Sequence, residues 1–189
     1  MNFSRKVSPP AGRTKSEGLF ERFLTDNGLE FERIREDTSS RPDYLVRIAE
    51  TNVIFEIKEI SKDEIFDAPG VVHSNTVGSY VRESINSSRK QIQYGANQGI
   101  PSVLLIYNAF DPLQWFGTLD LDFETAMYGE LTMFIDRRSG ATSELFNGKN
   151  QSLQVKKNTS FSAVGRLMDM GGRITVTLFE NFFSKVPLP

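Results

Sequence analysis

The sequence predicts an α/β protein in which a mixed β-sheet is covered by helices, and three observations support this prediction. Segments with apolar residues at helical spacing alternate with short β-branched and aromatic runs over the first half of the chain. The run PSVLLIYN at 101–108 is apolar almost throughout, which is typical of a strand buried on both faces. The last third contains alternating segments parted by glycine-containing turns, which indicates a β-rich C-terminal extension.

Length and composition favour one domain. The chain has 189 residues, of which 39% are hydrophobic and 24% charged, and no apolar run approaches the roughly 18 residues that a membrane span needs. We predict a flexible basic arm at 1–15 and a single domain at 16–189, with its core at 16–108 and the extension at 109–189. Because the N-terminus lacks an apolar signal region, we expect a cytoplasmic protein without a membrane partner. The absence of cysteine excludes disulfides and thiolate zinc sites.

The first elements of the core are a helix and three strands. Ser16 is a suitable N-cap for an amphipathic helix, and Gly28 is placed to end it. Three short alternating or β-branched runs follow, and we expect strands at LEFERIR (29–35), YLVRI (44–48) and VIFEIKEI (53–60). The polar AETN between the last two indicates a hairpin turn.

The second half of the core begins with a long loop. Residues 61–78 are rich in turn formers and show no sustained period. A helix is expected from Ser79 to Gly95 or Gly99, before Pro101. Its predicted apolar face consists of Val81, Ile85, Ser88 and Ile92. The buried strand at 101–108 completes the order.

The extension is expected to contain two hairpins. ELTMFID and TSELF flank RRSGA at 137–141, and FSAVGRLMDM and RITVTLFENF flank Gly171 and Gly172, which can supply the positive φ values of a tight turn. This part of the chain is expected to extend the sheet, with a share in a substrate groove or a dimer interface as a further hypothesis.

A group of charged residues on the central hairpin carries the predicted chemistry. Strand alternation places Glu56 and Lys58 on one face and Ile57 on the other, and a hairpin brings Asp43 close to Glu56. Two carboxylates form a hard oxygen site suited to Mg²⁺, for which Mn²⁺ should substitute. Such a metal activates water and stabilises charge on phosphate, with Lys58 holding the nucleophile or the transition state.

These residues resemble a known family. The pattern RPDYLV followed by FEIKE is similar to the signature of the PD-(D/E)XK nuclease superfamily, whose fold is called restriction endonuclease-like. The matching positions are Pro42, Asp43, Glu56 and Lys58. The α-β-β-β-α-β core of that family agrees with the order predicted above for residues 16–108.

The resemblance implies roles for these residues. Asp43 and Glu56 would bind the metal together with the carbonyl of Ile57, Lys58 would be the catalytic lysine, and the reaction would be hydrolysis of phosphodiester bonds. Many members place a further metal-site glutamate on the first helix. Glu17 is the first candidate for it and Glu21 the second, one helical turn later.

The helix containing SSRKQI adds further candidates by the same resemblance. Gln91 would point toward the active site as a catalytic residue, and Arg89 and Lys90 would contact nucleic-acid phosphates. His73 is the sole histidine and is interpreted as an incidental loop residue. These assignments are secondary to the hairpin residues.

The sequence therefore predicts a Mg²⁺-dependent nuclease, with DNA favoured over RNA and endonuclease over exonuclease by the family. The net charge of −2 does not by itself indicate nucleic-acid binding, although a local path of positive charge would be enough to bind a phosphate backbone. Two alternatives stay open: a catalytically silent nuclease-like binding or assembly module, and a structural ion pair in place of the metal site. A homodimer is an assembly that such nucleases often use.

Overall fold

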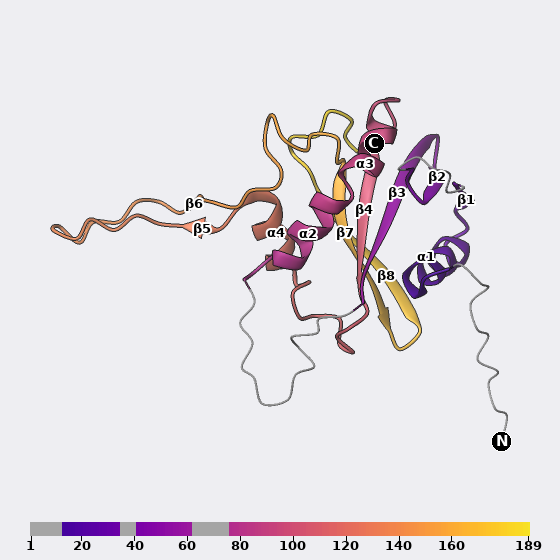
Figure 1. The fold of residues 1–189 in the computed structure, drawn as a ribbon, viewed down its shortest axis with the longest axis horizontal. Helices are drawn as coiled ribbons and strands as arrows, with labels where there is room; N and C mark the ends of the chain where they lie inside the picture. Colours follow the sequence, from indigo (N-terminus) through magenta and orange to yellow (C-terminus); the bar gives the residue numbers. More distant parts are fainter. Residues whose placement is uncertain (1–12, 35–40, 62–75) are drawn as a thin grey trace, which may run out of the picture.

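The computed structural model describes residues 13–34, 41–61 and 76–189, and within these ranges the chain is a mixed α/β fold (Figure 1). Its helices are α1 (Lys15–Asp26), α2 (Ser79–Ser87), α3 (Arg89–Ala96) and α4 (Asp120–Tyr128). The strands of its main sheet are β1 (Glu30–Arg33), β2 (Tyr44–Ile48), β3 (Thr51–Ile60), β4 (Ser102–Asn108), β7 (Ala163–Met170) and β8 (Arg173–Glu180). A separate pair is formed by β5 (Leu131–Thr132) and β6 (Phe146–Asn147). His73 and residues 1–12 of the predicted basic arm lie outside the described residues.

The six strands lie in the order β1-β2-β3-β4-β7-β8. The three central strands β3, β4 and β7 are parallel, while β1, β2 and β8 pair antiparallel with their neighbours. All seven residues of β4 are buried, which confirms the prediction of a strand covered on both faces. The predicted extension of the sheet is also confirmed, because β7 pairs with β4 and its hairpin partner β8 forms the edge.

Helix α1 begins one residue earlier than its predicted cap. The N-cap is Thr14 and not Ser16, because Thr14 forms a capping box with Glu17. The Glu17 amide donates to Thr14 Oγ1 at 3.2 Å, and the Thr14 amide donates to Glu17 Oε2 at 2.7 Å. Gly28 follows the helix with φ of 66°, so the predicted C-terminal stop is confirmed.

The β2–β3 hairpin is tighter than expected. Its turn consists of Ala49 and Glu50, with Ala49 at φ of 51°. Thr51 pairs with Ile48 and Asn52 with Arg47, so half of the predicted AETN turn belongs to β3. The tight turn fixes the pairing register of the two strands.

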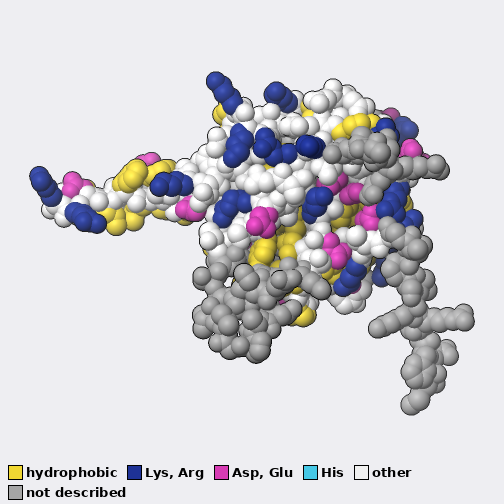
Figure 2. Space-filling view, in the orientation of Figure 1, with side chains coloured by type: hydrophobic (Ala, Val, Ile, Leu, Met, Phe, Trp, Pro, Cys, Tyr) yellow, Lys and Arg dark blue, Asp and Glu magenta, His cyan; other side chains and the backbone are white. Residues whose placement is uncertain are grey.

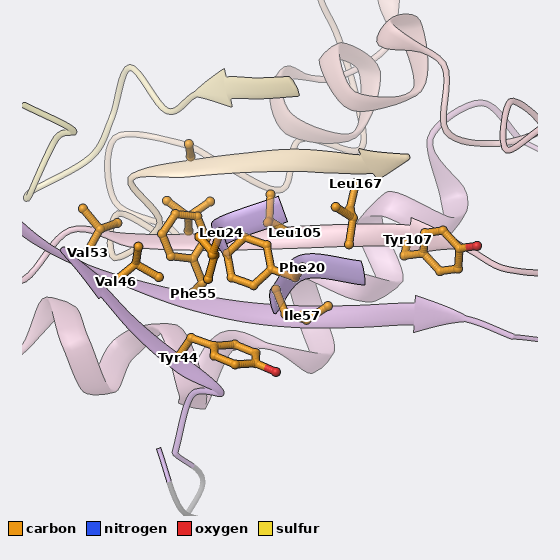
Figure 3. Close-up of a cluster of buried hydrophobic side chains, with 12 residues drawn as sticks. Phe20, Leu24, Tyr44, Val46, Val53, Phe55, Ile57, Leu105, Tyr107 and Leu167 are labelled. Carbon is orange, nitrogen blue, oxygen red and sulfur yellow. The ribbon is translucent and has the colours of Figure 1, made fainter. Parts of the chain in front are cut away.

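Two apolar layers hold the helices against opposite faces of the sheet. On one face, Phe20 and Leu24 of α1 pack against the inward side chains of β2, β3 and β4 (Figure 3). On the other face, α2, α3 and α4 pack against β4 and β7. The fold therefore has three layers, with α1 on one side of the sheet and α2, α3 and α4 on the other.

The helix predicted from Ser79 onward is divided into α2 and α3 at Ser88. The Ser88 hydroxyl donates to the Ser84 carbonyl at 2.8 Å, and Ser87 Oγ donates to the same oxygen at 3.1 Å. Such bonds from serine to the preceding turn bend a helix. The predicted apolar face is confirmed, since Val81, Ile85, Ser88 and Ile92 are all fully buried.

The C-terminal third is less uniformly β than predicted. Gly171 and Gly172 adopt φ of 63° and 95° in the β7–β8 turn, as expected for a tight hairpin. The residues before β5 form helix α4, which buries Phe123 and Met127 against the sheet. Helix α4 has only nine residues, so the helical spacing of its apolar residues is too short to predict the helix from the sequence. No described helix is long and apolar enough to cross a lipid bilayer.

Candidate active site

The β2–β3 hairpin places Asp43 at the end of the pairing between β2 and β3. The paired register ends with Tyr44 and Phe55, and Asp43 is the residue immediately before Tyr44. The backbone of Asp43 is held on both sides, because its amide donates to the Phe55 carbonyl at 3.2 Å and its carbonyl accepts from the Ile34 amide at 2.8 Å. The carboxylate therefore stands at a fixed position at the start of β2.

Strand alternation assigns the charged side chains to one face. Tyr44, Phe55 and Ile57 belong to the apolar layer under α1 (Figure 3). Their neighbours Glu56 and Lys58 consequently point to the face covered by α2 and α3. Glu56 is only 3% exposed, and its Oε1 lies 2.7 Å from Nζ of Lys58. The structure thus brings together the acid and the lysine that the sequence singled out.

A backbone amide fixes the Asp43 carboxylate. Oδ2 of Asp43 accepts a hydrogen bond from the Ile57 amide at 2.7 Å. The N–H and C=O of one strand residue point to the same side, so the Ile57 carbonyl also opens toward Asp43, where pairing with β2 has ended. The Asp43 carboxylate and the backbone of Ile57 therefore meet at the end of the hairpin, and Glu56 is the residue before Ile57 in β3.

This donor set fits a hard divalent cation. Carboxylate and carbonyl oxygens are the ligands that Mg²⁺ accepts, with waters completing its coordination. In the described part of the chain, no three acidic or histidine side chains gather closely enough to form a metal site by themselves. A cation here would depend on Asp43, Glu56 and the Ile57 carbonyl.

Glu17 lies in α1, on the face of the sheet opposite α2 and α3, and both of its carboxylate oxygens accept hydrogen bonds. Its Oε1 accepts from Arg33 at 2.6 Å, and its Oε2 accepts from the Thr14 amide at 2.7 Å. The second candidate, Glu21, pairs with Arg13 at 2.6 Å and accepts from the Tyr44 hydroxyl at 3.0 Å. The structure therefore brings neither glutamate into one acidic group with the hairpin carboxylates, and a metal role for either stays a prediction.

Gln91 lies in α3, which packs on β3 and β4. A Cβ atom added to Gly95 would lie 2.6 Å from Ile54 Cδ1, so the end of α3 rests directly on β3. One helical turn back from Gly95 is Gln91, and two residues along β3 from Ile54 is Glu56; both steps cover about 6 Å. Gln91 Oε1 is buried and has no hydrogen-bond partner among the described residues. The packing of α3 on β3 is compatible with the predicted position of Gln91, and its proximity to the hairpin acids stays a prediction.

Arg89 and Lys90 border a polar groove. The groove has a volume of about 480 Å³ and is lined by Asn86, Ser87, Arg89, Lys90, Gln91 and Gln93. Lys and Arg side chains are scattered across the face of the molecule that carries α2 and α3 (Figure 2). The groove thus has a polar lining that includes Gln91 and two cationic side chains.

In comparisons with protein-family models, with curated proteins and with solved structures, nothing matches this chain. The functional assignment therefore depends on the geometry of the site itself.

Sequence reasoning missed the cations that hold the glutamates of α1. Arg33 of β1 contacts Glu17 and Arg13 contacts Glu21, whereas the family resemblance had implied a metal role for Glu17, or for Glu21 as the second candidate. Alternation in LEFERIR places Arg33 on the helix-covered face and could have indicated this contact. Burial raises the pKa of the Tyr44 hydroxyl, and the adjacent Glu21 carboxylate raises that pKa further. Tyr44 therefore serves as a neutral hydrogen-bond donor to Glu21.

Proposed function

We propose that this chain is a metal-dependent nuclease of the PD-(D/E)XK type that hydrolyses phosphodiester bonds. The observation that carries the proposal is the hairpin geometry. The Asp43 carboxylate accepts from the Ile57 amide at 2.7 Å, directly after Glu56 in β3, and Lys58 Nζ lies 2.7 Å from Glu56 Oε1. A solvated salt bridge would not require a buried carboxylate with a second acid bonded to the next residue of the strand.

The order of the elements supports the proposal. Helix α1, strands β1 to β3, the bent helix α2–α3 and strand β4 follow one another in the α-β-β-β-α-β order of the restriction endonuclease-like fold. The signature residues occupy the second and third of these strands. We therefore assign the chain this fold as part of the same proposal.

The proposed chemistry is divided among four side chains. Asp43 and Glu56, with the Ile57 carbonyl, would hold Mg²⁺ or Mn²⁺, which supplies Lewis-acid stabilisation of phosphate charge when bound. Lys58 is placed to donate to the attacking water or to a non-bridging phosphate oxygen, because its ammonium group sits beside the buried Glu56. Gln91 can donate its amide to the same water or phosphate from the side of α3.

The substrate we propose is DNA. Arg89 and Lys90 at the groove supply a local positive edge to a chain whose net charge is −2. A phosphate backbone lying along the groove would pass Gln91 before reaching the hairpin. Hydrolysis at internal bonds is the simplest activity for an open groove of this kind.

The test is cleavage of supercoiled plasmid, linear duplex and single-stranded DNA with Mg²⁺, Mn²⁺ or EDTA. We expect metal-dependent cutting by the wild type and a loss of about 100-fold or more in Lys58→Ala, through the missing transition-state contact. Lys58→Gln keeps a donor beside Glu56 and guards against misfolding. Lys156→Ala, an exposed lysine far from the hairpin, is the matched control.

Two results would remove the proposal. Undiminished cutting by both Lys58 variants excludes the lysine from the reaction. Absence of cutting by the wild type with every metal favours a catalytically silent nucleic-acid-binding module. The latter has one observation in its favour, since the Glu17 oxygens are held by Arg33 and Thr14. Binding of labelled DNA without cleavage would distinguish that module from a purely structural ion pair.

A further inference from the structure

Residues 130–148 form a narrow β-ribbon that projects far from the body of the molecule (Figure 1). We call this segment the ribbon. Its root is closed by pairing of Glu130 with Gly148 and of Leu131 with Asn147. Its outer part is held by the Ile135–Thr142 bridge, and the tip turns through 136–141. An isolated two-stranded ribbon is marginally stable in water, so a projecting one indicates a surface that covers it.

The ribbon carries apolar side chains on both of its faces. Phe134 and Phe146 contact each other on one face as a tilted ring pair, with centroids 5.0 Å apart, and Phe134 is 68% exposed. Leu131 and Leu145 lie on the other face by strand alternation, and both are exposed. Figure 2 shows apolar side chains along much of the ribbon. Contiguous exposed apolar surface of this kind marks an interaction site.

The same chain has an apolar hollow at the root of the ribbon. The hollow has a volume of about 370 Å³, and its apolar lining includes Leu121, Met127, Tyr128, Phe179 and Phe182. Phe182 is 82% exposed, although its ring stacks on that of Tyr128 at 5.3 Å. The hollow is therefore roomy enough for an aromatic side chain, and part of its wall is left open to solvent.

The charges of the tip and of the hollow are complementary. Arg137 and Arg138 lie at the tip and form no ion pair within the described ranges of the chain. Glu124 and Glu180 line the hollow and are exposed. A ribbon cannot bring its own tip back to its own root. These charges can meet only when the tip and the hollow belong to different molecules.

We propose that two copies of this chain exchange their ribbons, each laying its apolar faces along the other ribbon and its tip against the other hollow. The ribbon spans about 25 Å from root to tip at roughly 3.3 Å per residue. Antiparallel ribbons of equal length place each tip at the opposite root. Because two antiparallel ribbons place both tips on both hollows at once, the exchange is isologous and closes at two copies.

A second copy fits these observations better than nucleic acid does. Residues 130–148 contain Arg137 and Arg138 but also Glu130, Asp136 and Glu144, so the ribbon has no cationic excess. A β-ribbon that enters a DNA groove needs such an excess to neutralise phosphates. The ribbon and the lining of the hollow together fall in the range of about 20 to 30 residues a side that stable interfaces use. The proposal does not depend on the nuclease activity.

The first test is the mass of the full chain in solution by light scattering at micromolar concentration. We expect twice 21.4 kDa for the wild type, and dissociation of Phe134→Ser with a dimer Kd raised about tenfold or more. Val155→Ser is the matched control, because Val155 is equally exposed but lies outside the ribbon and the hollow. A wild-type monomer, or a dimer that Phe134→Ser leaves intact, would overturn the proposal.

The second test uses the absence of cysteine in the chain. A protein with Arg138→Cys is mixed with one carrying Glu124→Cys and oxidised. We expect a disulfide-linked heterodimer, which the pair Arg138→Cys and Val155→Cys should not form. Failure of the first pair to cross-link in a protein of dimeric mass would place the interface elsewhere. A monomer whose DNA binding is lost in Phe134→Ser would instead make the ribbon a nucleic-acid contact and would also overturn the proposal.

Discussion

The Asp43 carboxylate accepts a hydrogen bond from the Ile57 amide and is also a ligand of the proposed metal. Because Oδ2 accepts from Ile57 N at 2.7 Å, Asp43→Ala would leave a backbone donor without its acceptor, at a cost of about 1 kcal/mol. Asp43→Asn retains an oxygen acceptor and removes the charge. It also removes repulsion between two facing carboxylates, so the free energy of unfolding should not fall. The asparagine variant therefore separates metal binding from folding.

For Asp43→Asn we expect Mn²⁺ affinity to fall about tenfold or more in calorimetric titration, because a neutral amide oxygen is a poorer ligand for a hard cation. The thermal midpoint of the metal-free protein should stay equal to that of the wild type or rise. Glu50→Gln removes an acid from the turn at the other end of the same hairpin and serves as the control. Equal Mn²⁺ affinity in Asp43→Asn and wild type would remove Asp43 as a ligand.

At the scale of single residues, the sequence predicted what strand alternation alone determines. Glu56 and Lys58 differ by two positions in one strand, so their common face follows from the backbone. The partners of Glu17 did not follow. Its ion pair requires Arg33 from a separate strand. Its capping role requires Thr14, and not Ser16, to be the N-cap of the helix. Both depend on where the helix starts and how it packs, which short-range patterns do not fix.

At the scale of elements, the contact of α3 with β3 is the one on which the proposed position of Gln91 depends. A Cβ atom on Gly95 would lie 2.4 Å from Ser102 Oγ and 2.6 Å from Ile54 Cδ1. Gly95→Ala should therefore push α3 from the sheet and lower the free energy of unfolding by about 1 to 3 kcal/mol, as overpacking does. Gly18→Ala in α1 is the matched control, since nothing lies within 4 Å of its added Cβ.

The control should move in the opposite direction. Alanine at Gly18 improves helix propensity and should raise the free energy of unfolding by up to about 1 kcal/mol. Urea unfolding of both variants measures the difference. Equal shifts would contradict the tight approach of α3 to β3, and with it the register that sets Gln91 beside Glu56.

The sequence predicted most elements of the core but not the break at Ser88 or helix α4. The apolar face of the predicted second helix is continuous through Ser88, because the buried positions keep their helical spacing across the bend. The bend arises from hydroxyl bonds to Ser84, which leave no trace in a hydrophobic pattern. Helix α4 is a single short stretch whose position depends on Asp122, which accepts from the Gly78 amide at 2.8 Å. That bond joins segments far apart in the sequence.

At the scale of the whole molecule, the ribbon is the feature that a monomer does not explain. Strand patterning predicted a hairpin around RRSGA but not that the hairpin would stand away from the sheet, and the dimer interface was a hypothesis from the family resemblance. The pattern of apolar residues on a strand shows that they are buried somewhere; it does not show in which molecule. The exposure of Phe134 and the apolar hollow near Phe182 support a second copy of the chain as the molecule that buries them.

If two copies exchange ribbons, folding and association are linked, and the thermal midpoint should rise with protein concentration. A monomer has no such dependence. We expect the midpoint of the wild type to increase steadily over a hundredfold range of concentration, while that of Phe134→Ser stays flat at the lower end. Val155→Ser should follow the wild type, since its exposed side chain contributes nothing to the exchange. A flat midpoint for the wild type, measured well above and below micromolar concentration, would mean that the ribbon is not covered by a second copy and would leave its apolar faces to a different partner.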